Sequence, residues 1–354
     1  CDPTPLKLSP PGPALACPFP GPALRDRMRT RHLGRNGPEV SALGLGCLSF
    51  GGIFGPTTRE ESLGALDAAW DAGITFLDTA NIYGKGVSET VMGEWLRKRG
   101  HRPHIATKAA FTDNPARRID NRPEHLRAEL EGSLKRLGVD HVTLFYAHRH
   151  DPQVPAEDLA GTMLRLVEEG KILGYGLSEV APYTVERCHA VHPVMAVQNE
   201  YSLWTRQPEL GLIQLCGRLG VAFVPFSPLA RGVFGTPMAD PATFAEGEFR
   251  TRIPRFQAEN WPQNLLKLRA FHQMAEDRGL TPAALALAWV LDRGPHLIPI
   301  PGTRSADHLH AWTKAPEIDL DDHDREAIDC LLPVGWAWGD RYDDAQAGTV
   351  ERYC

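Results

Sequence analysis

The sequence predicts an α/β protein built as one (β/α)8 or TIM barrel, with an N-terminal β-hairpin and long loops on its catalytic face. Eight short runs of β-branched or apolar residues alternate with longer helical patterns along almost the whole chain, as parallel strands with crossover helices require. The chain has 354 residues, and such a barrel takes about 250. One barrel with extensions therefore fits the length.

Residues 1–27 are predicted to form a flexible extension. They contain eight prolines and little hydrophobic periodicity, a composition that buries too little apolar surface to become ordered. The ordered pattern begins close to Met28, and we hypothesise that Met28 is a natural start. The predicted organisation is the extension 1–27 followed by a single barrel domain, 28–354, whose C-terminal tail covers about 313–354.

A β-hairpin is predicted over residues 31–40, before the barrel. Asn36-Gly37 is a strong short-range hairpin signal, and Pro38 favours an edge position because proline donates no backbone hydrogen bond.

The barrel strands are predicted from short apolar runs and the helices from the longer patterns between them. The predicted strands are Leu43–Gly46, Thr75–Asp78, Ile105–Lys108, Val142–His148, Leu173–Ser178, Ala196–Glu200, Ala222–Ser227 and His296–Pro301. The predicted helices lie near 60–72, 88–99, 123–137, 155–169, 182–191, 208–219, 263–291 and 305–313. An open doubly wound sheet is the alternative, but it normally shows a GxGxxG turn after its first strand, and only Gly44-Leu45-Gly46 is present.

Two segments are expected to cover the barrel. Residues 232–260 are rich in Gly, Pro and mixed charge, which predicts a long surface loop over the catalytic end. The stretch 335–342 carries several aromatic residues near the C-terminus. It is predicted either to fold back over the pocket mouth or to pack against an outer helix or a partner subunit.

Charge, hydropathy and cysteine content limit the kinds of partner and the cellular compartment that we expect. The net charge is −6, from 44 acidic and 38 basic side chains, which favours neither nucleic acid nor an anionic membrane. No apolar run approaches the roughly 20 residues of a membrane span, and no signal-peptide pattern is seen. Seven cysteines without CxxC pairs are interpreted as free thiols in a reducing compartment. We expect a cytoplasmic protein that acts on a small molecule, and a homo-oligomer is compatible with the sequence.

Four polar residues end or follow predicted strands and are the candidate catalytic residues: Asp78, Tyr83, Lys108 and His148. The carboxyl ends of barrel strands converge on one face. A tyrosine with a pKa near 10 becomes a useful proton donor when a neighbouring cation such as Lys108 favours its phenolate. Asp78 would hold that ammonium, and His148 would orient a substrate oxygen.

Each residue of this set also has a structural interpretation. Asp78 and Lys108 could form a buried ion pair without a catalytic role, and Tyr83 could be a packed loop aromatic. His148 could be a core histidine, or a metal ligand with His150 and Asp151. The metal interpretation is disfavoured because no further ligand has matching spacing.

Seven strings occur in the order that resembles the aldo-keto reductases: FLDTANIYG, IATK, LFYAHRHD, GYGLSE, QNEYSLWTR, VPFSPLARG and IPIPGTR. The resemblance covers roughly Met28 to Trp312, and each string falls on a predicted strand end. It implies that Asp78, Tyr83, Lys108 and His148 are the catalytic tetrad. It also implies hydride transfer from NADPH to an aldehyde, ketone or keto-sugar on a barrel that needs no Rossmann domain.

The resemblance further implies the cofactor contacts. Ser178 and Gln198 would hydrogen-bond the nicotinamide carboxamide, Phe226 would stack on the nicotinamide, and Arg304 would bind the 2′-phosphate, because guanidinium matches phosphate bidentately. The full set of implied cofactor positions is Gly46, Cys47, Leu48, Ser178, Glu179, Gln198, Phe226, Ser227, Leu229, Arg231, Gly232, Gly302, Thr303, Arg304 and His308.

Departures from the family pattern bear on the cofactor. Glu179 replaces a commoner Asn, His308 stands where an Arg often binds phosphate, and Ala311-Trp312 replaces a frequent Glu-Asn pair. A neutral His308 would lose charge-assisted bonding to the 2′-phosphate. NADH is therefore kept as a second candidate cofactor.

Substrate selection is expected in loops after the strands, at Phe54, Phe111, Arg149 and Trp204. Two alternatives to a general carbonyl reductase stay open: a cofactor-binding regulatory subunit with little turnover, and a biosynthetic reductase for one complex intermediate.

Overall fold

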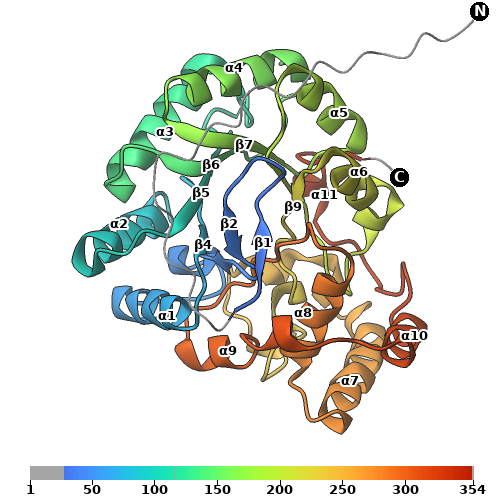
Figure 1. The fold of residues 1–354 in the computed structure, drawn as a ribbon. Coiled ribbons are helices and arrows are strands. Elements are labelled where there is room, and N and C mark those ends of the chain that lie inside the picture. The colour runs from blue at the N-terminus through green and yellow to red at the C-terminus, as the bar shows by residue number, and fades with distance from the viewer. Residues whose placement is uncertain (1–27, 116, 353–354) are drawn as a thin grey trace, which may run out of the picture.

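The computed structural model describes residues 28–115 and 117–352, so the predicted extension 1–27 lies outside the described residues. The described chain forms the predicted barrel, in which parallel strands are surrounded by helices (Figure 1). A hairpin of β1 (Thr30–His32) and β2 (Glu39–Ser41) precedes the barrel and pairs antiparallel. The hairpin prediction is confirmed, with a longer turn in which Gly34 takes the positive φ of 80°.

Seven parallel strands follow one another around the barrel in chain order. They are β3 (Leu45–Gly46), β4 (Phe76–Asp78), β5 (His104–Ala109), β6 (Val142–Ala147), β7 (Ile172–Ser178), β8 (Ala196–Gln198) and β9 (Ala222–Phe223).

The prediction of a regular eighth strand over His296–Pro301 is wrong. Isolated bridges, instead of a regular strand ladder, join this part of the chain to its neighbours. Leu297 bridges Phe223 and Gly302 bridges Gly46, both in parallel. Backbone bonds from Ile298 N to Phe223 O (2.8 Å) and from Gly46 N to Pro301 O (3.0 Å) place the segment between β9 and β3. Its prolines lack the N–H groups that a full ladder needs. The segment nevertheless closes the barrel.

Eleven α-helices lie in the described part of the chain. They are α1 (Arg59–Asp71), α2 (Val87–Arg99), α3 (Pro123–Leu137), α4 (Ala156–Glu168), α5 (Pro182–Val191), α6 (Leu212–Leu219), α7 (Trp261–Asp277), α8 (Pro282–Asp292), α9 (Ala306–His310), α10 (Asp322–Leu331) and α11 (Asp344–Ala347). Local sequence explains several starts: Thr58 and Glu61 form a capping box before α1, and proline occupies the first turn of α3 and α5.

The single helix predicted over 263–291 is wrong, because two helices, α7 and α8, occupy that range. Gly279 follows α7 with a φ of 67°, a left-handed conformation that stops a helix and suits glycine. Thr281 then caps α8 by accepting from Ala284 N at 3.1 Å, and Pro282 is its first residue. The end of α7 and the start of α8 are thus both encoded by residues at the boundary itself.

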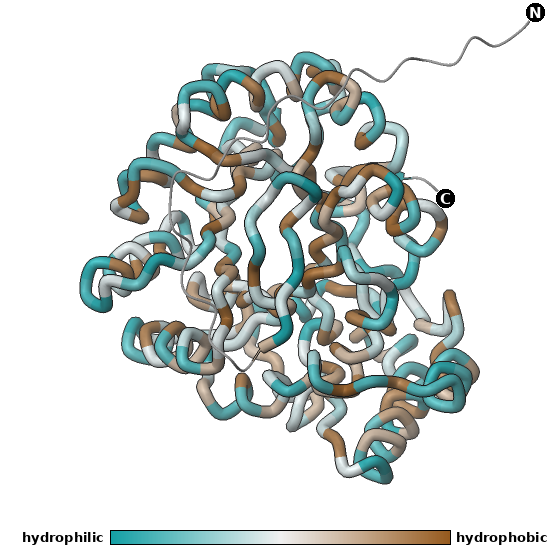
Figure 2. Tube along the Cα trace, in the orientation of Figure 1, coloured by the Kyte–Doolittle hydropathy of each residue, from teal (hydrophilic) through white to brown (hydrophobic). Residues whose placement is uncertain are grey.

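Two apolar layers hold the barrel together. The larger lies between the sheet and the helices, whose surfaces carry both hydrophobic and hydrophilic residues (Figure 2). The smaller fills the barrel interior and includes Phe76, Leu144, Tyr146 and Ile300. Tyr146 fits there because its register partner is Gly176, where an added Cβ would lie 2.4 Å from the tyrosine ring.

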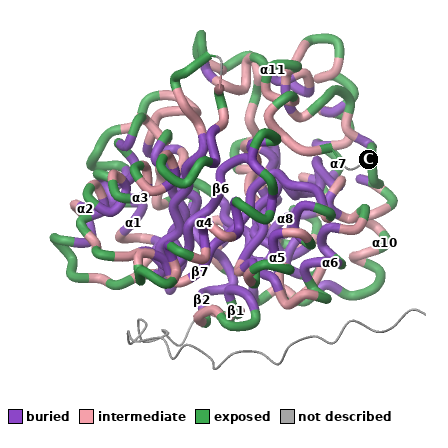
Figure 3. The backbone as a smooth tube through the Cα atoms, turned by 90° about the horizontal axis from the view of Figure 1, so that it is seen from above, coloured by how far each residue is buried: buried purple, intermediate pink, exposed green. Residues whose placement is uncertain are grey.

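The two ends of the barrel are covered differently. The hairpin lies at one end and α11 at the opposite end (Figure 3), and Leu33 and Val40 of the hairpin region join the interior core. The predicted loop 232–260 contains only short 3-10 helices, η4 (Pro241–Thr243), η5 (Phe249–Arg252) and η6 (Pro254–Phe256). In the described residues we find no helix of the length and hydrophobicity that a membrane crossing needs.

Candidate active site

The four predicted catalytic residues meet at the carboxyl ends of neighbouring strands. Asp78 ends β4, Lys108 lies in β5, His148 directly follows β6, and Tyr83 lies in the turn between β4 and α2. Asp78 and Lys108 are almost completely buried, whereas Tyr83 is half-buried. Three strands thus supply the polar groups, and the loop after β4 brings the phenol to them.

Lys108 is the centre of this group. Its ammonium forms an ion pair with Asp78 and donates to the carbonyl of Thr79 at 2.7 Å. It also lies 3.3 Å from the hydroxyl oxygen of Tyr83. Burial alone would lower the pKa of Lys108, but the charges of Asp78 and Tyr83 outweigh burial and raise it. The ammonium therefore stays charged at neutral pH.

Tyr83 and His148 face each other next to this ammonium. Their ring centres are 6.0 Å apart, edge to face. Burial raises the pKa of Tyr83, and the charge of Lys108 opposes that rise. Burial, followed by the charges of Arg149 and Lys108, holds the pKa of His148 well below its usual value. His148 is therefore a neutral imidazole at neutral pH, and its Nδ1 has no hydrogen-bond partner among the described residues.

The ends of β7 and β8 carry the residues expected near the nicotinamide. Gln198 donates to Asp78 at 2.8 Å, which ties the end of β8 to the buried ion pair. Ser178 ends β7 and accepts a hydrogen bond from Arg149 at 3.3 Å. Glu179 has a positive φ of 56°, and its carboxylate pairs with Arg341 and accepts from the backbone N–H of Glu200.

Unusual backbone follows Phe226, whose half-buried ring stands just past β9. Ser227 and Arg231 have φ angles of 49° and 58°, and Gly232 has 103°. Left-handed conformations at non-glycine residues cost energy and cluster at functional sites. Leu229 is half-buried in this stretch, and the Arg231 side chain is bound to Glu200 at 2.9 Å.

The implied phosphate pocket lies where the barrel closes. Gly302 bridges Gly46, and an added Cβ on Gly302 would meet the Gly46 carbonyl oxygen at 2.9 Å. Arg304 donates to the carbonyls of Phe54 and Pro56 at 3.1 and 2.8 Å. His308 is exposed on α9.

The remaining implied positions are near this closure. Cys47 is buried and donates its backbone N–H to Asp78 O at 2.8 Å. Leu48 begins η1 (Leu48–Gly51), and Thr303 is buried between Gly302 and Arg304.

The four predicted substrate-pocket residues divide into two groups. Phe111 lies 5.1 Å from the His148 ring, and the Arg149 guanidinium lies 5.6 Å from the Phe111 ring. Phe54 instead packs on Phe249 of the long loop at 6.4 Å. Trp204 is buried and stacks on Trp336 at 6.1 Å. The structure thus brings Phe111 and Arg149 next to the tetrad.

Sequence reasoning missed the contacts of a C-terminal strap, which we define as residues 335–351. Arg341 pairs with Glu179 and Glu200, at the ends of β7 and β8. Glu351 pairs with His150 and accepts from Ala181 N at 2.7 Å. The tail packs against an outer helix, as one of its two predictions has it: Trp338 and Asn264 of α7 exchange two hydrogen bonds, of 2.8 and 2.9 Å. The Arg341 ion pairs also hold it near the ends of β7 and β8. The aromatic content was the only local signal, because all three ion pairs join distant positions.

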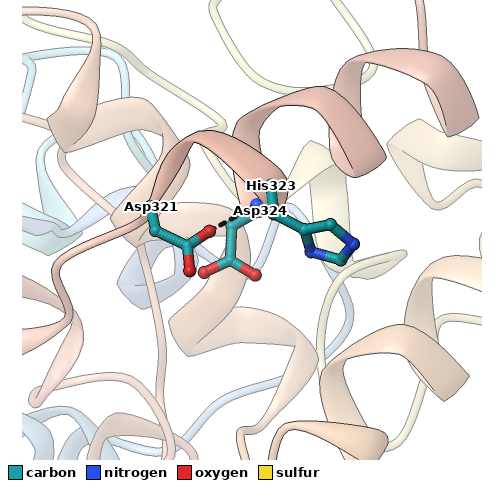
Figure 4. A group of neighbouring side chains, drawn as sticks. All are labelled: Asp321, His323 and Asp324. Carbon is teal, nitrogen blue, oxygen red and sulfur yellow. Dashed lines mark hydrogen bonds between the residues drawn. The ribbon is translucent and has the colours of Figure 1, made fainter.

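Metal-like clusters have structural explanations. Asp321 caps α10 by accepting from Asp324 N at 2.8 Å, and Asp324 pairs with Arg278. These two residues and His323 could approach one ion (Figure 4), but Asp321 and His323 are exposed at a helix start. His150 uses one ring nitrogen for Glu351 and the other for Val154 O at 3.1 Å.

Comparisons with known proteins agree with this geometry. The family model described as "Aldo/keto reductase family" matches residues 42–333. The chain is 40% identical to "Probable aldo-keto reductase 1" of Glycine max, over 88% of this chain and 90% of that protein. It is 37% identical to "Aldo-keto reductase yakc [NADP(+)]" of Schizosaccharomyces pombe, over 86% of this chain and 93% of that protein.

Two solved structures have the same fold. The glycerol dehydrogenase AKR11B4 from Gluconobacter oxydans matches with a TM-score of 0.79 at 27% identity, over 89% of this chain and 98% of that one. A thermostable aldo-keto reductase, Tm1743, in complex with the inhibitor epalrestat, matches with a TM-score of 0.69 at 29% identity, over 86% of this chain and 100% of that one.

Proposed function

Because this chain belongs to the aldo/keto reductase family, we propose that it is an NADPH-dependent carbonyl reductase with Tyr83 as general acid. Its substrate would be an aldehyde, a ketone or a keto-sugar. The observation that carries this proposal is the 3.3 Å contact between the Tyr83 hydroxyl and the Lys108 ammonium, at the catalytic end of the barrel.

Tyr83 would deliver a proton to the carbonyl oxygen while that oxygen gains negative charge. Bound NADPH supplies the hydride that adds to the carbonyl carbon. The phenolate left on Tyr83 would be stabilised by the Lys108 charge, which already opposes the rise of the Tyr83 pKa. Such general acid catalysis contributes about 10²–10⁴-fold to the rate.

Three further residues would have positioning roles. Asp78 and Gln198 would hold the Lys108 ammonium in place, and His148 would orient the substrate. Asp78 fixes the Lys108 ammonium by an ion pair, and Gln198 fixes the second oxygen of Asp78. His148 is neutral, so its ring can donate one N–H to the substrate oxygen without competing as a charged acid. Tyr83 is only half-buried, which is compatible with access of that oxygen to the phenol.

The residues fit a nicotinamide cofactor. Phe226 offers a half-buried aromatic face beyond β9. Positive φ angles at Ser227 and at 230–232 orient backbone groups in a way typical of anion sites. Ser178 and Gln198 would hold the carboxamide, and Arg304 the 2′-phosphate. Arg231 is bound to Glu200 and to the Arg341 carbonyl, so it would contribute positive charge near the pyrophosphate.

NADPH is proposed as the preferred cofactor and NADH as a weaker one. One relative is named with NADP(+), and Arg304 supplies a guanidinium near the implied phosphate position. His308, however, supplies no permanent charge there. The dissociation constants of the two cofactors test this order, and equal values would contradict it.

The proposed reaction is tested by NADPH oxidation with a panel of simple aldehydes, sugar derivatives and polycyclic ketones, for wild type and Tyr83→Phe. We expect turnover by wild type, and loss of nearly all of it in the variant with unchanged NADPH affinity. An active Tyr83→Phe would exclude Tyr83 as proton donor. Cofactor binding without turnover on any substrate would indicate a regulatory subunit or a reductase for one complex intermediate.

A further inference from the structure

Arg149 is a buried cation beside the tetrad, and no carboxylate among residues 28–115 and 117–352 pairs with it. Its residue is only 8% exposed. One terminal nitrogen, Nη1, donates to the His148 carbonyl at 2.6 Å and to the Ser178 hydroxyl at 3.3 Å. Its Nε is buried and has no hydrogen-bond partner among the described residues.

The neighbouring carboxylates are already bound to other arginines. Glu179 pairs with Arg341, and Glu200 pairs with both Arg231 and Arg341. In the described chain, no ion pair joins Arg149 to an acidic residue. Buried charges in proteins are normally paired, because an unpaired one loses its hydration without compensation. The unpartnered Nε of Arg149 therefore calls for an anion that the described residues do not provide.

The position of Arg149 points to the substrate. The guanidinium lies 5.6 Å from the Phe111 ring, which lies 5.1 Å from the His148 ring. Burial raises the pKa of Tyr83, and the charge of Arg149, like that of Lys108, opposes that rise. The implied phosphate-binding positions of the cofactor follow β9 and the closing segment 296–302, whereas Arg149 follows β6. A cofactor phosphate is therefore the less suitable partner.

We propose that Arg149 recognises an anionic group of the substrate, so that the preferred substrates are carbonyl compounds that carry a carboxylate or a phosphate. This inference rests on the proposed reductase function and names the substrate class of that site. A planar guanidinium binds either group by charge-assisted hydrogen bonds, and the buried Nε of Arg149 is a donor that has no partner among the described residues. Phe111 would pack beside the carbon skeleton that links the anion to the carbonyl.

The test compares anionic aldehydes with related neutral ones. The carboxylate pair is meta-carboxybenzaldehyde and meta-formylbenzamide, and the phosphate pair is glyceraldehyde 3-phosphate and glyceraldehyde. Steady-state kcat and KM with NADPH are measured for wild type, Arg149→Gln, Arg149→Lys and the control Arg187→Gln. Arg187 also loses one positive charge, but it lies on α5 and pairs with Glu157 away from the tetrad.

We expect wild type to prefer the anionic member of at least one pair, and the pair that shows the preference identifies carboxylate or phosphate. Arg149→Gln should lower kcat/KM for that member by about 30-fold, mainly through KM, because charged hydrogen bonds of this kind carry such factors. The neutral member should change less than about threefold, Arg149→Lys should fall between, and Arg187→Gln should match wild type. Equal losses on both members, or a weaker affinity for NADPH, would overturn the inference.

A binding measurement separates this inference from the proposed reaction. Calorimetry on the protein with NADP⁺ compares meta-(hydroxymethyl)benzoate with meta-(hydroxymethyl)benzamide, and it needs no turnover. Tighter binding of the benzoate by wild type, lost in Arg149→Gln, supports anion recognition even if no aldehyde is reduced. Active reduction without any preference for the anion would leave the reductase function intact and exclude this role of Arg149. Thermal unfolding of each variant checks that it is folded.

Discussion

The Lys108 ammonium lies 3.3 Å from the Tyr83 hydroxyl and 5.0 Å from the centre of the tyrosine ring. One buried cation therefore contacts the proposed proton donor and, on its other side, the Asp78 carboxylate. The contacts of Lys108 with Asp78 and Tyr83 offset the free-energy cost of burying this cation. Stability and chemistry are coupled at this point, and substitutions here should change both.

Lys108→Met should lower the free energy of unfolding by about 3–5 kcal/mol, because Asp78 is left as a buried charge without its cation. The double variant Lys108→Met/Asp78→Leu should lose less, since it removes both charges. Denaturant unfolding of Lys108→Met, Asp78→Leu and the double variant checks this. A double variant that loses the sum of the two single losses would show that the charges are not coupled.

His104 should make the protein sensitive to acid. Burial lowers its pKa to about 4, whereas an unfolded chain takes up a proton near pH 6.5. The contribution of neutral His104 to the free energy of unfolding is complete above about pH 6.5. It is lost as pH falls toward 4, and the loss is at most about 3 kcal/mol.

His104→Gln can keep a hydrogen bond to Thr143, which lies 3.3 Å from the ring, and should flatten the unfolding free energy between those pH values. His323→Gln, at an exposed position of α10, is the control. An unchanged acid profile in His104→Gln would contradict the prediction.

His308→Arg should strengthen NADPH binding by about tenfold and leave NADH binding unchanged. A permanent guanidinium would add charge-assisted hydrogen bonds to the 2′-phosphate. His310→Arg is a matched control, since it adds the same charge at another exposed position of α9. Cofactor titrations compare the variants, and equal gains in the two would indicate a general charge effect.

The strap should loosen as pH rises above neutrality. Burial would lower the pKa of His150, but its hydrogen bond and ion pair with Glu351 outweigh burial and raise it. The pair is therefore fully formed below about pH 6.5 and is lost as pH rises through the raised pKa of His150. Hydrogen exchange of residues 344–351 should report this loss.

Glu351→Gln is the matching variant for the strap. It should exchange faster at pH 6 and show little further change toward pH 8, because its side chain cannot ionise. A pH response as large as that of wild type would assign the effect to another group.

The strand ends were predictable because apolar runs mark buried parallel strands, and the polar residues that end them, such as Asp78 and Lys108, interrupt that pattern. Local signals also existed for two features that were predicted wrongly: Gly279 and Thr281-Pro282 end one helix and begin the next, and Pro299 and Pro301 weaken the eighth strand. The pairing of Glu179 with Arg341 could not be predicted, since it depends on a tail that returns across the barrel.

The bridge between Gly46 and Gly302 joins the two ends of the barrel sequence. During synthesis, the outer edge of β3 stays unpaired until the closing segment has been made, which takes more than two hundred further residues. Closure is thus the most non-local step of folding, and long-range pairing of this kind is slow and leaves an open edge exposed to aggregation. The prolines of the closing segment offer few backbone donors, which limits strand addition by other molecules along that side.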